Sequence, residues 1–162
     1  MTTKELISFS NELRRNQEYS FIARELERLE LVELVDLFVF ANEGLPFLAK
    51  SKISRMVSNW TYERYGYYSA LRAFNYGYDL RAINEIFLSG DADKKKVLVE
   101  ETHAWIESMP YELMPIMIDT MLAFLDKERY VFMCEESKEF LIDILSKRVK
   151  YFKEKRKKEI GI

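Results

Sequence analysis

The sequence is poor in cysteine and histidine, with one of each in 162 residues. Because a lone cysteine cannot form an intramolecular bridge, Cys134 excludes a disulfide-stabilised fold. The N-terminus also lacks a leader of the secretory kind, in which a charged segment precedes an apolar one and a small-residue cleavage site. Together these features predict a cytoplasmic protein.

Glycine and proline are scarce too, with five and three residues, whereas strand-rich domains need frequent turns. The longest apolar run, Leu31 to Ala41, contains Glu33 and Asp36 and is much shorter than the ~20 residues of a membrane helix. We therefore predict no membrane association and an all-α fold, a single compact bundle of about six to eight helices.

Several helix ends are marked by capping residues. Thr2 with Glu5 fits a capping box, Asp91 or Asp93 can cap a helix that ends before Pro110, and Gly44 followed by Pro46 is a stop signal. A second helix is expected to begin near Tyr19 or Ser20 and to run into the apolar segment 31–41, which should be surrounded by other helices. A strand at Val35 to Ala41 is the alternative. Two further helices are expected in the C-terminal half, with these inward residues: Ile118, Met121, Leu122 and Leu125 in a helix starting at Pro115, then Phe140, Leu141, Ile144, Leu145, Val149 and Phe152 in a helix capped by Ser137.

Charge divides the chain unevenly. Lys147 to Glu159 contains eight basic and two acidic residues, a net +6, which leaves −8 on the rest of a chain whose net charge is −2. We assign residues 1–146 to a helical core domain and 147–162 to a basic end or tail of the last helix. A solvated helix end is the ordinary interpretation of such a run. Phosphate contact with a nucleic acid is the alternative, through the basic residues Lys147, Arg148, Lys150, Lys153, Lys155, Arg156, Lys157 and Lys158.

No catalytic or cofactor motif is evident. Glu100 and His103 form an E-x-x-H pair, but a di-iron bundle requires a second such pair, which a chain with one histidine lacks. The glycines are too widely spaced for a phosphate-binding loop. We therefore predict no catalytic residue, no metal site and no cofactor, and a protein that is not an enzyme.

Aromatic residues are concentrated between Asn59 and Arg81, which hold eight rings and six of the ten tyrosines. If residues 60–79 form one continuous helix, three faces separate. The first face carries small residues that suit close packing (Gly66, Ala70, Ala73 and Gly77), and the second carries large apolar residues that suit the core (Trp60, Tyr67, Leu71, Phe74 and Tyr78). The third, which we call the Tyr/Arg face, is made by Tyr65, Tyr68, Arg72 and Tyr76.

The Tyr/Arg face has two interpretations. It can be a partly buried face whose polar groups bond to other helices. It can also bind a partner, because tyrosine and arginine are enriched at binding hot spots. We predict a non-enzymatic interaction protein, acting as an inhibitor, adaptor or regulator, that binds a protein partner through this face. The alternatives are a nucleic-acid-binding regulator that uses the basic segment, and a homodimer formed through the aromatic face.

Overall fold

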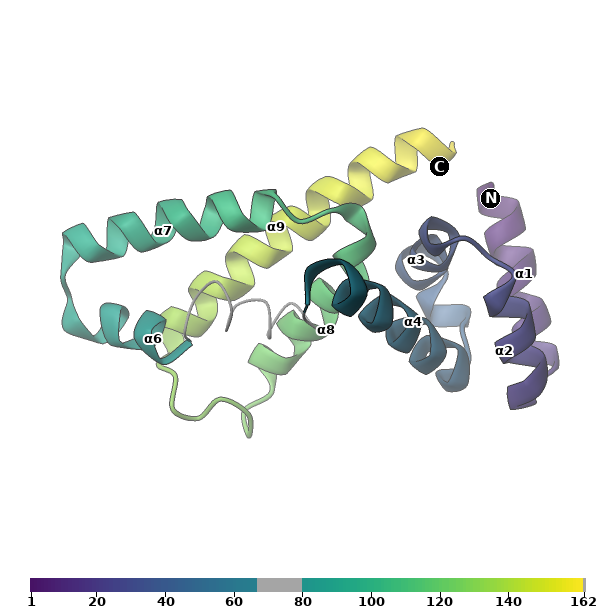
Figure 1. Ribbon diagram of the computed structural model, residues 1–162, viewed down its shortest axis with the longest axis horizontal. Coiled ribbons are helices and arrows are strands. Elements are labelled where there is room, and N and C mark those ends of the chain that lie inside the picture. Colours follow the sequence, from purple (N-terminus) through teal and green to yellow (C-terminus); the bar gives the residue numbers. More distant parts are fainter. Residues whose placement is uncertain (67–79, 162) are drawn as a thin grey trace.

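Within residues 1–66 and 80–161, which the computed structural model describes, the chain forms eight α-helices and no strand (Figure 1). The all-α prediction is confirmed, and the alternative of a strand at residues 35–41 is wrong. The helices are α1 (Thr3–Arg15), α2 (Tyr19–Glu27), α3 (Leu31–Phe40), α4 (Phe47–Tyr65), α6 (Leu80–Ser89), α7 (Ala92–Glu107), α8 (Met114–Leu125) and α9 (Glu135–Ile160), with short 3₁₀ helices η1 (Asn42–Gly44) and η2 (Tyr111–Leu113).

The helices pack as a compact bundle in which α8 and α9 join the two ends (Figure 1). Helices α1 to α4 form one end, and α6 and α7 form the other. Helix α8 packs along α9 and also contacts α3 and α4, while α9 contacts α6 and α7. The C-terminal half of α9 therefore reaches back toward the N-terminal helices.

Helix α3 lies in the interior, as the apolar run predicted. It packs against α1, α4, α8 and η2, and six of its residues are buried. One of these six, Asp36, is a carboxylic acid with no exposed surface. A buried charge is tolerated only when it is paired and hydrogen-bonded, so α3 requires a cationic partner from another element.

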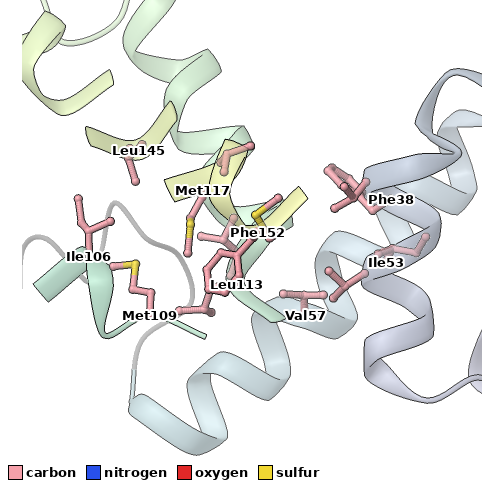
Figure 2. Close-up of a cluster of buried hydrophobic side chains, with 14 of the residues drawn as sticks. Phe38, Ile53, Val57, Ile106, Met109, Leu113, Met117, Leu145 and Phe152 are labelled. Carbon is pink, nitrogen blue, oxygen red and sulfur yellow. The ribbon is translucent and has the colours of Figure 1, made fainter. Parts of the chain in front are cut away.

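The core is one cluster to which most helices contribute. Figure 2 shows part of it, with Phe38 of α3 beside Ile53 of α4, Met117 of α8 and Phe152 of α9 in the middle, and Ile106 of α7 on the opposite side. The predicted α9 residues all pack in or against this cluster. Hydrophobic contacts therefore connect residues that lie more than 100 positions apart in the sequence.

Several predicted helix ends are confirmed. The Thr2 hydroxyl accepts a hydrogen bond from the amide of Glu5 at 3.3 Å, and the Asp91 carboxylate accepts bonds from the amides of Asp93 and Lys94. These side chains pair amides that would otherwise have no partner in the first helical turn. Helix α4 begins directly after Pro46.

The second helix is not continuous with the apolar run, contrary to the prediction. It ends at Glu27, and α3 starts anew at Leu31. Glu30 has an extended backbone and caps α3, with the Glu33 carboxylate accepting a hydrogen bond from the Glu30 amide at 3.1 Å. This reciprocal capping box ends one helix and begins the next.

The condition on which the three faces were sorted, one continuous helix through residues 60–79, is not met. Helix α4 ends at Tyr65, and Gly66 adopts the left-handed conformation with φ of 77°. Its amide bonds to the carbonyl of Tyr62 at 2.8 Å, which closes the helix. Glycine favours this cap because it has no Cβ to oppose a positive φ.

Two details of the C-terminal half differ from the prediction. Helix α9 starts after Cys134, and Ser137 lies buried in its first turn instead of capping it. Helix α8 buries Met114, Met117 and Phe124, whereas the predicted inward residues Leu122 and Leu125 are largely exposed. On so apolar a helix, periodicity alone does not select the buried face.

Asn84 of α6 holds the segment that precedes α9. Its Nδ2 atom donates to the carbonyl of Phe132 at 2.9 Å, and its Oδ1 atom accepts from the amide of Cys134 at 2.7 Å and the hydroxyl of Ser137 at 3.0 Å. One buried amide therefore joins α6, the α8–α9 connection and α9.

Of the helices in the described ranges, none is both long enough and apolar enough to cross a bilayer.

Candidate functional site

The predicted Tyr/Arg face lies mostly outside the described residues. Of its members, Tyr68, Arg72 and Tyr76 are in segment 67–79, and only Tyr65 is described. Tyr65 stands at the end of α4, where its ring meets Trp60 edge to face at 5.9 Å and the Arg64 guanidinium lies over both rings. Partner binding and homodimerisation through this face remain predictions.

The basic segment, Lys147 to Glu159, is helical throughout, because α9 continues without a break to Ile160. Its eight basic side chains nevertheless have different environments. Four have identified protein partners: Arg156 and Arg148 interact with other elements, Lys147 pairs with Asp143 one turn earlier at 2.9 Å, and the Lys155 ammonium lies 6.0 Å from the ring centre of Tyr151. The other four are lysines, and three of these are exposed, namely Lys150, Lys157 and Lys158.

Arg156 is the partner of the buried Asp36. Its Nε and Nη2 atoms donate to the two carboxylate oxygens at 2.9 and 2.8 Å, while Nη1 contacts Glu159. The hydroxyl of Tyr111 donates to the same carboxylate at 2.6 Å. This triad joins α3, η2 and α9, and it engages the Arg156 guanidinium in contacts within the fold.

The environment of the triad favours one charge state. Burial raises the pKa of Tyr111, and its hydrogen bond to Asp36 raises that pKa further. The hydrogen bond to Asp36 is also the main reason that the pKa of Arg156 is raised. A neutral phenol and a charged guanidinium therefore surround the carboxylate. The sequence contained a signal for such a partner, because Asp36 is an acid within an apolar run.

Arg148 also serves the fold. Its Nη2 atom donates to the carbonyl of Glu107 at 2.7 Å, and its guanidinium lies 4.2 Å from the ring centre of Phe152 and 4.9 Å from that of Tyr151. It thus pairs a carbonyl at the C-terminus of α7, where the helix dipole favours a cation. Both arginines of the predicted nucleic-acid site are engaged in internal contacts.

Four exposed lysines of the basic segment form one face of α9, which we call the lysine face: Lys147, Lys150, Lys155 and Lys158, with the half-exposed ring of Tyr151 among them. Between Lys147 and Lys158 the helix rises by about 17 Å. Glu154 lies in the same stretch and offsets part of the charge. The lysine face can bind an extended anionic segment.

The other lysines of the basic segment, Lys153 and Lys157, line a groove against α1 and the end of α3. Sequence reasoning missed this groove because its walls come from three separate helices. The only local signal is the helical spacing of Ile7, Ser10 and Arg14 on one face of α1.

Other reactive side chains lie apart from one another. His103 lines a groove between α7 and α9 with Glu107, Lys147 and Arg148. Cys134 lies instead at the start of α9, where its thiol donates to Ser137 at 3.4 Å. Among the described residues, no three His, Cys, Asp or Glu side chains are grouped so that they could hold a metal ion.

Comparison with known proteins adds no relative. No protein-family model, curated protein or solved structure matches this chain.

Proposed function

We propose that the protein is a non-enzymatic helical interaction protein that binds an acidic segment of a protein partner along the lysine face of α9. The observation that carries the proposal is the difference between the arginines and the lysines of the basic segment. Arg148 and Arg156 stabilise the fold, whereas the lysines remain on the surface. Positive charge displayed on an otherwise acidic protein attracts anionic partners and speeds their association.

An acidic protein segment suits this surface better than a nucleic acid. The planar guanidinium of arginine is the group best suited to nucleic-acid recognition, and both arginines of the segment are engaged in internal contacts. The rest of the chain carries a net charge of −8, which repels a large polyanion. A short segment that contacts α9 alone avoids most of this repulsion, and the exposed ring of Tyr151 offers it an amphipathic contact.

Binding of labelled oligomers tests the proposal. Fluorescence anisotropy would compare a peptide rich in Asp and Glu with single- and double-stranded oligonucleotides of equal charge, each at several salt concentrations. The peptide should bind more tightly at about 0.15 M salt, where only charges within about 8 Å interact strongly. Tighter binding of the oligonucleotides, with affinity falling steeply as salt rises, would replace the proposal with the nucleic-acid alternative.

Charge-matched variants locate the surface. The double substitution Lys150→Glu/Lys158→Glu should weaken peptide binding by about tenfold, because it removes two attractive charges and adds two repulsive ones. The control Lys96→Glu/Lys127→Glu makes the same change in net charge at exposed positions on α7 and after α8. An equal loss in the control would show that net charge, not the lysine face, determines binding.

The Tyr/Arg face stays a second prediction for protein binding. Alanine substitution of Tyr68 and Arg72 should abolish capture of a partner while leaving the far-ultraviolet circular dichroism unchanged. Unfolding of that variant would assign the two residues to the core.

A further inference from the structure

A polar groove runs between α1, the C-terminal end of α3 and the last turns of α9. It consists of two cavities of about 550 and 290 Å³ that share Ile7, Val39, Phe40 and Lys153. The apolar side chains supply one wall, and polar residues of α1 and η1 supply much of the rest. A volume of several hundred Å³ is typical of a site for a small molecule.

Unpaired polar atoms are concentrated in this groove. In the part of the chain that the structure describes, five buried side-chain polar atoms have no hydrogen-bond partner. Three of them belong to groove residues: the hydroxyls of Thr3 and Ser10, and the Oδ1 atom of Asn42. Ser10 is only 3% exposed. A buried polar group without a partner destabilises a fold by about 1–3 kcal/mol, and the two hydroxyls among these atoms can each donate a hydrogen bond to an anionic ligand.

Gly44 keeps this part of the groove open. A Cβ atom at this position would lie 2.9 Å from the Ser10 hydroxyl oxygen and 3.8 Å from an Arg14 guanidinium nitrogen. The hydroxyl and the guanidinium therefore converge on the backbone of η1. A larger residue at position 44 would occupy the space beside them.

The groove is positively charged. Arg14, Lys153 and Lys157 line it, against one acid, Glu43. Within residues 1–66 and 80–161, none of these three cations forms an ion pair. Unpaired cations beside hydroxyl donors are the groups that recognise a carboxylate or phosphate.

We propose that this groove binds a small organic anion, whose carboxylate or phosphate group lies between Arg14 and Lys153 and bonds to the Ser10 hydroxyl. Its carbon skeleton packs on Ile7, Val39 and Phe40. The site is distinct from the lysine face, since Lys150 and Lys158 do not line it. This proposal goes beyond the proposed function and does not depend on it.

Isothermal titration with four simple probes tests the ligand class. Hexyl phosphate and hexanoate carry both an anion and a chain, hexanol carries only the chain, and inorganic phosphate only the anion. At least one of the first two should bind with a Kd below about 1 mM and more tightly than hexanol or inorganic phosphate. Comparison of hexyl phosphate with hexanoate identifies the preferred anion. Failure of both to bind would overturn the proposal.

Substitutions then place the ligand. Arg14→Gln and Lys153→Gln should each weaken binding by about tenfold, because each removes a positive charge that the protein places beside the anion. Lys127→Gln, far from the groove, and Lys150→Glu/Lys158→Glu, on the lysine face, should leave binding within about twofold. If the lysine-face variant alone lost binding, the anion would be held there and the groove assignment would be wrong.

Ser10→Ala distinguishes a binding role from a structural one. Removing an unpaired buried hydroxyl should raise the Tm of the unliganded protein by about 2–4 °C. The same substitution should lower the affinity for the anion by about fivefold, because the ligand loses a hydrogen bond. A variant that loses stability, or that binds as tightly as the original protein, would contradict the proposed contact with the Ser10 hydroxyl.

Discussion

Arg156 contacts both carboxylate oxygens of Asp36, a residue that precedes it by 120 positions. Asp36 has no exposed surface, while the Arg156 side chain is 20% exposed. Loss of the cation would leave a buried carboxylate without its charge partner. Removing either residue alone should therefore destabilise the fold strongly.

Breaking this pair should be costly. Arg156→Met should lower the free energy of unfolding by about 3–5 kcal/mol, because the Asp36 charge stays buried without its partner. Urea denaturation measures the change, and Lys158→Met on the exposed side of α9 should cost less than about 0.5 kcal/mol. Replacing all three polar members, as Asp36→Leu/Arg156→Met/Tyr111→Phe, should recover most of the loss. If the triple variant were no more stable than the single one, the destabilisation would arise from something other than the unpaired charge.

Stability should decline at alkaline pH because of Tyr111. Its pKa is raised above the ordinary value of about 10 by burial and by Asp36, so above pH 10 the unfolded chain loses a proton that the folded protein retains. The stabilisation is complete below pH 10 and falls by at most about 1.4 kcal/mol per pH unit above it. Urea midpoints between pH 8 and 11 measure the slope.

Tyr111→Phe should remove this contribution to the alkaline slope, although it loses the hydrogen bond to Asp36 at neutral pH. Tyr19→Phe at an exposed ring is the control, and its slope should match that of the original protein. Identical slopes in all three proteins would show that Tyr111 ionises normally.

Asn84→Ala should loosen the start of α9. The substitution leaves the amide of Cys134 without its acceptor and removes one of the two acceptors of the Ser137 hydroxyl, at a cost of about 2 kcal/mol. The Cys134 thiol should also react faster with a disulfide reagent, because the segment that holds it opens more often. Asn59→Ala, at an exposed position of α4, is the matched control. An unchanged thiol reaction rate would indicate that Asn84 does not hold this segment.

Gly66→Ala should destabilise the protein through the backbone alone. Apart from its own residue and the two neighbouring ones, no heavy atom of the described chain lies within 4 Å of the added Cβ, so the cost of about 1 kcal/mol comes from the positive φ. Gly66→Asn should cost less, because asparagine tolerates this conformation better. Unfolding in urea compares the two variants. An alanine variant of higher stability would favour the continuous helix that the sequence suggested.

Local signals in the sequence predicted the helices better than their faces. Thr2 and Asp91 cap helices because their side chains bond amides within three residues, which is a property of the local sequence. Leu122 and Leu125 appeared equally suited to the core, but the position of α9 determined that Met117 and Phe124 are buried instead. The end of α4 was missed because Gly66 was assigned to a close-packed helical strip.

The site depended still more on tertiary structure. The basic segment was evident, yet the sequence did not distinguish Arg156 from Lys158, since only the fold brings Asp36 beside one of them. The groove was not predictable for the same reason. Nothing in the local sequence distinguishes Ser10, Asn42 and Lys153, which belong to three elements. They form a candidate site only because the fold places them around one cavity.

The pairing of Asp36 with Arg156 also bears on the order in which the chain can fold during synthesis. The helices that surround Asp36 leave the ribosome first, but the residue that neutralises it is made 120 residues later. Until α9 emerges, burying α3 would leave the Asp36 carboxyl without its cation, so we expect the packing of the N-terminal helices alone to be weakened. We therefore expect a polypeptide that stops before Arg156 to be less stable and more accessible to chaperones and proteases.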